Sequence, residues 1–375
     1  MDTLTTPSNW QKVRLGDICE IVKGQQINKI SLNNTDKYPV INGGIDFLGY
    51  TNKFNVSKNT IAISEGGTCG YVRFMTSNFW SGGHNYSLQK ISNRVNNLCL
   101  YHILKSYEKD IMKLGVGSGL KNIQLKALKD FEILLPPLNE QTAIANILSD
   151  VDRYLYSLDA LILKKESVKK ALSFELLSQR KRLKGFNQAW QKVRLGDIGK
   201  PCMCKRVMKH QTTPYGEIPF YKIGTFGNTA DAFISKKLFL EYKAKYSFPK
   251  KGDILISASG TIGRAVIYDG KPAYFQDSNI VWIDNDETLV KNDFLFYAYS
   301  NIKWNTEHTT ILRLYNDNFR NTLIPLPPLN EQIAIANILS ALDHEIISLK
   351  NKKRQFENIK KALNHDLMSA KIRVL

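Results

Sequence analysis

The side chains best suited to chemistry in this sequence are hydrogen-bonding groups on glycine-rich segments. Lysine, arginine, glutamine and asparagine can bond to base edges in a DNA groove, and lysine can also bond to phosphates. In the first half of the chain the candidates for DNA binding are Lys23, Gln25, Gln26, Asn28, Lys29, Asn42, Thr68, Arg73, His84 and Asn85. In the second half they are Lys205, Arg206, Lys209, Lys222, Thr261, Arg264, Gln276, Asn279 and Arg313. The competing interpretation of any one of them is an ordinary polar loop residue.

The charge of the chain favours a polyanionic partner. The 375 residues include 52 Lys and Arg against 34 Asp and Glu, which gives a formal net charge of +18. Nucleic acid is the first candidate for such a partner. We expect Lys23, Lys29, Lys205 and Lys209 to contact phosphates. Lysines that only keep the protein in solution are the alternative explanation of the charge.

Catalytic motifs are missing from the sequence. It contains no H-E-x-x-H, no Walker A loop and no D/N-P-P-Y/F sequence, and its five cysteines are not spaced as zinc ligands. The sequence L-P-P-L at 135–138 lacks both the polar residue and the aromatic residue that would hold a flipped base. We therefore expect no catalytic residue, no metal site and no cofactor in this chain.

Two sequence repeats must position the candidate residues. WQKVRLGDI at 10–18 recurs unchanged at 190–198, and LPPLNEQTAIANILS at 135–149 recurs as LPPLNEQIAIANILS at 326–340. A repeat unit of this length indicates a duplicated domain rather than a solenoid. Duplication without a function is the alternative.

The segment inside each repeat has the composition of a mixed domain. Short apolar runs broken by glycine and asparagine predict strands joined by tight turns, with helices near 97–114 and 291–301. Gly67-Thr68 and Gly260-Thr261 occupy matching turns, while the neighbouring polar residues differ. We infer two modules that share a scaffold and recognise different targets.

A long helix follows each L-P-P-L-N-E-Q sequence. Asn139 and Asn330 are placed to cap these helices, which we expect to reach about 45 residues without an internal Gly or Pro. Apolar residues at spacings of three and four form a seam on each helix. They are Ile144, Leu148, Val151, Leu155 and Leu158 in the first copy and Ile335, Leu339, Leu342, Ile346 and Leu349 in the second. We infer an intramolecular antiparallel pair, and a homodimer through the same seam is the alternative.

These features define an α+β fold with a pseudo-twofold internal repeat. Two homologous globular α/β modules are separated by two long antiparallel helices that form an intramolecular coiled coil. The expected segments are a first recognition module at 1–138, a central helix at 139–184, a second module at 185–329 and a C-terminal helix at 330–375.

The doubled motifs W-x-x-x-x-L-G-D-I and L-P-P-L-x-E-Q resemble type I restriction-modification specificity subunits over the whole chain. The resemblance implies two target recognition domains, each of which reads one half of an interrupted, asymmetric DNA site. It also implies that the helices act as a spacer and a docking platform for methyltransferase subunits, two of them, through the ten seam residues named above. The expected partners are thus double-stranded DNA, these subunits and, through the complex, a restriction translocase-nuclease.

The resemblance assigns the chemistry to the partners. S-adenosylmethionine, ATP and Mg²⁺ act on those subunits, which carry DNA methylation and host defence, and the chain itself is not an enzyme. The other classes considered are a fused restriction-methylation enzyme, which the missing motifs disfavour, and a coiled-coil adaptor without DNA affinity. Because no basic leader with an apolar core and no run of 18 apolar residues occurs, we expect a cytoplasmic protein with no membrane contact.

Overall fold

The computed structural model describes residues 9–304, 307–308 and 312–374. The chain divides into two compact units, Met1–Ala160 with Asn351–Leu375 and Leu161–Lys350. Each unit therefore combines one module with part of both long helices. This division cuts across the four consecutive segments that the sequence suggested.

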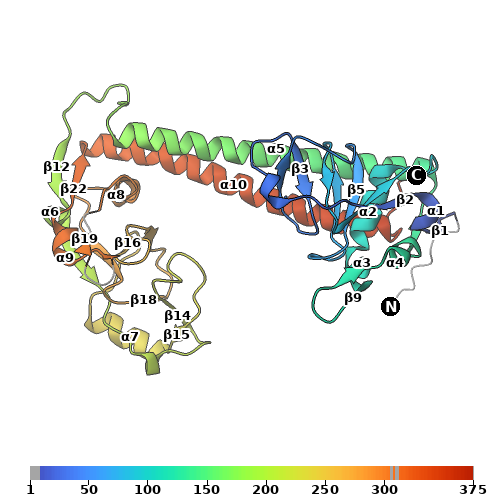
Figure 1. Cartoon of the computed structure of the whole chain (residues 1–375). Coiled ribbons are helices and arrows are strands. Elements are labelled where there is room, and N and C mark those ends of the chain that lie inside the picture. The colour runs from blue at the N-terminus through green and yellow to red at the C-terminus, as the bar shows by residue number, and fades with distance from the viewer. Residues whose placement is uncertain (1–8, 305–306, 309–311, 375) are drawn as a thin grey trace. The chain divides into compact units, whose positions relative to one another are not determined.

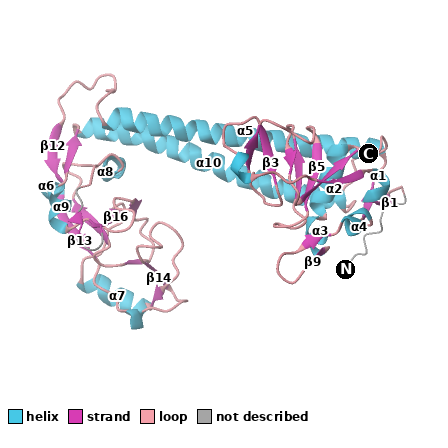
Figure 2. Cartoon of the chain, viewed as in Figure 1, coloured by secondary structure: helices cyan, strands magenta, loops and turns pink. Residues whose placement is uncertain are grey.

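The first module contains two main sheets (Figures 1 and 2). One is antiparallel, in the order β2 (Glu20–Lys23), β8 (Asn85–Gln89), β5 (Thr60–Ser64), β6 (Val72–Met75). The other has the order β4 (Gly49–Thr51), β3 (Tyr38–Ile41), β7 (Trp80–Ser81), with β3 and β7 parallel. Two small pairs complete it: β1 (Gln11–Arg14) with β11 (Glu132–Leu135), and β9 (Gly115–Val116) with β10 (Asn122–Ile123). The helical segments are α1 (Leu15–Ile18), η1 (Lys29–Ser31), α2 (Asn97–Ser106), α3 (Glu108–Lys113) and α4 (Leu125–Lys129).

The second module repeats this topology. Its sheets have the orders β13 (Gly199–Met203), β19 (Ile280–Asn285), β16 (Ile254–Ser257), β17 (Ala265–Ile267) and β15 (Phe233–Ile234), β14 (Ile218–Tyr221), β18 (Tyr274–Phe275). The small pairs are β12 (Gln191–Arg194) with β22 (Leu323–Leu326) and β20 (Glu307–His308) with β21 (Leu312–Arg313). Its helical segments are α6 (Leu195–Ile198), η2 (Lys209–Gln211), α7 (Lys236–Lys245), α8 (Asn292–Tyr299) and α9 (Asn316–Asn321). The duplication and both predicted module helices are confirmed, whereas α7 was not predicted.

The central strand of each module is buried on both faces. In β5, Ile61 and Ile63 belong to one apolar cluster and Ala62 to another. In β16, Ile254 and Ile256 likewise face a different cluster from Leu255. Successive side chains of a strand point to opposite faces, so an uninterrupted apolar run suits a strand packed on both sides. In β5 and β16 the polar residues Thr60, Ser64 and Ser257 consequently stand at the strand ends.

The long helices are α5 (Leu138–Leu177) and α10 (Leu329–Met368). Both begin one residue earlier than the predicted caps, so Asn139 and Asn330 lie in the first turn. The capping prediction was wrong because each helix begins directly after the two prolines. Both helices also end before the limits of 184 and 375 that the sequence suggested.

The two helices pair in opposite directions within each unit, as Figure 1 shows. In the first unit the rings of Tyr154 and Phe356 lie 4.6 Å apart and Lys353 Nζ lies 2.7 Å from Asp159. The intramolecular antiparallel pair is thus confirmed.

The same direction of pairing holds in the second unit. There Lys165 Nζ lies 2.8 Å from Glu345, and Lys350 Nζ lies 2.6 Å from Glu166. Lysine–carboxylate pairs between the two helices therefore occur in both units.

A buried glutamate ties each module to its helices. Glu140, at the start of α5, accepts from Trp10 Nε1 at 3.1 Å and from Arg373 Nε at 2.8 Å, and Arg373 follows α10. In the second unit Glu331 accepts in the same way from Trp190 at 3.0 Å and from Arg182, which follows α5. In each unit, the glutamate at the start of one long helix therefore binds an arginine that follows the end of the other long helix.

The neighbouring glutamine joins the helix start to the module. Gln332 Oε1 accepts from Lys291 N at 2.8 Å, and its Nε2 donates to Leu289 O and Pro327 O. Gln141 makes the equivalent bonds in the first unit. The E-Q pair of the repeated motif is therefore a buried structural joint that fixes each module on its helix.

Candidate nucleic-acid interface

A polar pocket of about 500 Å³ collects most of the predicted side chains of the second module. Those that line it are Arg206, Lys209, Lys222, Gln276, Asn279 and Arg313. They come from the β13–β14 region, the end of β14, the β18–β19 turn and β21. The structure thus brings together residues that are more than 100 positions apart in sequence.

Carboxylates and carbonyl groups orient the cations of this pocket. Arg206 Nε donates to Asp277 at 2.8 Å, and Lys222 Nζ lies 2.9 Å from Asp231. Arg313 Nη2 donates to Ser278 O at 2.6 Å. A pocket with fixed donors of this kind suits the acceptors of a DNA groove and its phosphates.

Thr261 and Arg264 line a second, smaller pocket of about 240 Å³ in the same module. Arg264 Nη2 lies 3.3 Å from Gly227 O, which holds its guanidinium across the turn. Lys205 lines neither of these pockets, and its Nζ lies 5.1 Å from the centre of the Tyr246 ring.

One turn has the same backbone in both modules and carries different side chains. The sequence is S-E-G-G-T-C-G at 64–70 and S-A-S-G-T-I-G at 257–263. Gly67 and Gly260 have φ of 69° and 63°, a left-handed conformation that favours glycine. In each copy the glycine that ends the turn donates to the first serine, and the second residue donates to the residue that precedes the neighbouring strand, His84 or Asn279. The predicted match of the two turns is confirmed.

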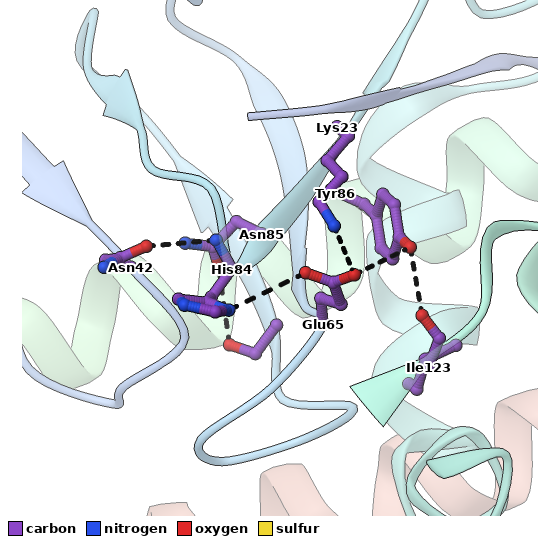
Figure 3. A network of polar contacts seen from close by, with 8 residues as sticks. Lys23, Asn42, Glu65, His84, Asn85, Tyr86 and Ile123 are labelled. Carbon is purple, nitrogen blue, oxygen red and sulfur yellow. Dashed lines mark hydrogen bonds and ion pairs between the residues drawn. The ribbon is translucent and has the colours of Figure 1, made fainter. Parts of the chain in front are cut away.

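Four predicted residues of the first module gather around this turn. Lys23 ends β2, His84 precedes β8, Thr68 N donates to Gly43 O, and the side chain of Asn42 accepts from His84 N at 3.0 Å. Figure 3 shows Lys23, Asn42 and His84 together.

The other predicted residues of this module have different surroundings. Asn85 is buried with 2% of its surface exposed, which excludes direct contact with DNA in this structure. Asn28 caps η1 by accepting from Ile30 N, and Arg73 donates to Ile45 O and stacks over Phe47. Lys29 and Gln25 are exposed, and Gln26 lies against Gly83.

The structure adds three residues that the sequence did not single out. Glu65 lies among the predicted residues of the first module, together with Tyr86, and Asp277 pairs with Arg206 in the second. Burial, with Glu65 beside it, raises the pKa of Tyr86 to about 12, so its hydroxyl stays protonated at neutral pH. The signal available in the sequence was a carboxylate directly before the Gly66-Gly67 turn of a basic module.

The seam residues of the helices are mostly covered. Ile144, Leu148, Leu158, Ile335, Leu339 and Ile346 are buried, and Val151, Leu155, Leu342 and Leu349 are partly buried. Because these side chains are buried or partly buried, they account for the pairing of the helices. Little of their surface remains for a partner protein. Other apolar side chains of the helices are exposed, among them Tyr156, Leu163, Ile347 and Ile359.

The residues that the structure describes include no cluster of three or more His, Cys, Asp or Glu that could hold a metal ion. No helix within these residues is long and apolar enough to cross a bilayer.

Comparison with known proteins gives consistent results. The profile of the family described as "Type I restriction modification DNA specificity domain" matches residues 7–165 and 187–358. A Haemophilus influenzae protein named "Putative type I restriction enzyme specificity subunit" is 40% identical over 81% of this chain and 81% of its own length. The Methanocaldococcus jannaschii protein named "Type I restriction enzyme MjaVIII specificity subunit" is 27% identical over 100% of this chain and 95% of its own length.

A solved structure shares the fold. The crystal structure of the type I restriction-modification system S subunit from M. genitalium superposes with a TM-score of 0.68 at 24% identity, covering 97% of each chain.

Proposed function

The chain belongs to the type I restriction-modification specificity subunit family, and from that premise we propose that it selects the DNA sequence on which partner subunits act. Each module reads one half of an interrupted, asymmetric site. The observation that carries this proposal is the turn at 64–70 and 257–263, where one backbone presents different side chains in the two modules. Two such surfaces are suited to two different half-sites.

The helices serve as the spacer and as the docking platform for two methyltransferase subunits. The exposed apolar residues Tyr156, Leu163, Ile347 and Ile359 support this proposal better than the covered seam does. An apolar patch with a polar rim is typical of a surface for another protein, and these side chains would supply apolar contacts to it. The restriction subunits join through the same complex, and S-adenosylmethionine, ATP and Mg²⁺ act on the partners.

Methylation mapping tests the proposal directly. The chain is expressed with its methyltransferase partner in a host without methylation, and modified bases are mapped by single-molecule sequencing. We expect an interrupted site with two different halves. A single continuous palindrome would contradict the assignment of one half-site to each module.

Exchanging a module supplies the second arm of the test. Residues 19–134 are replaced by the corresponding module of another family member, which leaves Trp10 and the E-Q joint in place. One half-site should change and the other should not. Changes in both halves would argue against independent modules.

A further inference from the structure

The first module contains a buried carboxylate that has no counterpart in the second. Glu65 is 8% exposed, and its Oε1 lies 2.6 Å from Lys23 Nζ and 3.3 Å from the Tyr86 hydroxyl (Figure 3). Its Oε2 lies 3.8 Å from His84 Nδ1. The Tyr86 hydroxyl also lies 3.0 Å from Ile123 O, so its single proton can serve only one of these acceptors at a time.

The strand register identifies the equivalent positions of the second module. Lys23 stands opposite Tyr86 in the first module, as Met203 stands opposite Val281 in the second. Glu65 N donates to His84 O, as Ala258 N donates to Asn279 O. The second module therefore has Met, Ala, Asn and Val where the first has Lys, Glu, His and Tyr.

Stability of the fold does not explain Glu65. Transferring a carboxylate into a poorly solvated site is unfavourable, and ion pairing offsets that cost only in part. Ala258 shows that the same turn forms with a small apolar residue at this position. The charged network is therefore better explained by a role of its exposed side chains in binding.

Two side chains of the network are exposed, Lys23 and His84, and of the two Lys23 is the one that lies within hydrogen-bonding distance of Glu65. The Lys23 side chain is 54% exposed, whereas that of Glu65 is 11% exposed beneath it. Glu65 itself has little access to a base edge. Lysine has three donors, and with one directed to Glu65 two remain for an external acceptor.

We propose that Glu65 is a positioning residue that holds Lys23 to read a guanine in the half-site of the first module. This inference rests on the proposed function. Guanine offers two adjacent acceptors in the major groove, O6 and N7, which match the two free donors of a fixed lysine. An ion-paired lysine is a weak ligand for a phosphate because its charge is already compensated. The proposal therefore replaces the phosphate contact expected of Lys23 from the sequence, whereas Lys29 keeps that expectation.

The test measures DNA binding by the complex of the chain with its methyltransferase partner. The probes are duplexes of the mapped site in which each guanine of the first half-site is replaced in turn by 7-deazaguanine or by another base. The variants are Lys23→Met, Glu65→Gln, Glu65→Ala and the double variant Lys23→Met/Glu65→Ala. Lys29→Met is the matched control, an exposed lysine of the same module.

Lys23→Met should reduce discrimination at one guanine by about tenfold or more and leave the salt dependence of binding unchanged. Glu65→Gln and Glu65→Ala should weaken discrimination at that same guanine. In the Lys23→Met background, Glu65→Ala should have no further effect on discrimination, because it acts through the lysine. Lys29→Met should weaken binding to all sequences alike and reduce the salt slope by about one.

Three results would overturn the inference: a first half-site without guanine, a Lys23→Met variant that behaves like Lys29→Met, or Glu65 variants with unchanged discrimination. Lys23→Met leaves the buried Glu65 carboxylate without its ion pair, which destabilises the module. The double variant Lys23→Met/Glu65→Ala removes both charges and reproduces the Met203 and Ala258 of the second module, so it remains informative even if the single variants unfold. Failure of the proposed function is distinguishable, since the unmodified complex would then show no preferred interrupted site at all.

Discussion

At the scale of single residues, the buried glutamine of each joint is a position at which substitution should be costly. Gln332 satisfies one backbone N–H and two carbonyl groups, and it is 0% exposed. Gln332→Ala should lower the free energy of unfolding of the second unit by about 3 kcal/mol, because buried polar groups lose their partners. Chemical denaturation measures the change, with the exposed Asn337→Ala as control. Equal stabilities of the two variants would refute the structural role of the joint.

A buried histidine makes the first unit sensitive to acid. Burial, and then the nearby Lys360, lower the pKa of His102 to about 4 from its ordinary value of 6.5. The unfolded chain therefore binds this proton more readily, and stability is lost as the pH falls through 6.5 towards 4. We expect about 2 kcal/mol of this loss between about pH 7.5 and pH 5.

Unfolding curves at several pH values check the effect of His102. His102→Leu should flatten the pH dependence, and His210→Leu, which removes an exposed histidine, should not. An unchanged pH dependence in His102→Leu would rule out this source of acid sensitivity.

The sequence predicted the types of the interface residues better than their surroundings. Polar residues on glycine-rich turns could be recognised, and six from the second module share one pocket. The pairing of Lys23 with Glu65 depends on the register of β2, β8 and β5, which spacing alone does not fix. Asn85 was proposed as a contact, but its strand places it inside the sheet.

At the scale of elements, ion pairs between α5 and α10 favour their antiparallel alignment. Lys165→Glu places a carboxylate opposite Glu345 and should destabilise the second unit by about 1 kcal/mol, less at high salt. Adding Glu345→Lys should restore most of the loss. A double-mutant cycle measures the coupling, and two effects that simply add would show that the pair contributes nothing.

The helices were easier to predict than the module strands. An apolar seam repeated over about four turns indicates a long helix regardless of tertiary contacts. The strands are short, and α7 lies in the connection 235–253, which is much longer than its counterpart 52–59. Its apolar residues Leu238 and Phe239 pack on the module core, a contact that the local pattern did not reveal.

At the scale of the whole molecule, each compact unit contains one module and the adjoining parts of both long helices, which the repeats alone did not indicate. The sequence suggested modules followed by separate helices, whereas Ile144 and Leu148 belong to the core of the first module, and Ile335 and Leu339 to that of the second. Contacts between residues of different repeats fix this division, and such contacts leave no periodic signal in the sequence.

The spacer role of the helices predicts a change in the DNA site. A heptad inserted after Leu158 and another after Leu349 preserve the seam register and fall close to the boundary between the compact units. Each adds roughly 10 Å of helix at about 1.5 Å per residue, and DNA rises about 3.4 Å per base pair. The gap between half-sites should lengthen by up to about three base pairs.

Methylation mapping of the lengthened protein decides the matter. Retained methylation with an unchanged gap would refute the spacer role. Insertion of two residues at the same positions is the control, since it rotates the seam by about half a turn and should abolish methylation.

The repeated joint of tryptophan, glutamate and arginine also has an evolutionary consequence. Because each module is held by the same few contacts, selection can preserve the joint while the turns of one module diverge independently of the other. Under the proposed function, any first module can then be combined with any second one. The repertoire of recognisable sites thus grows as the product of the two sets of modules rather than as their sum.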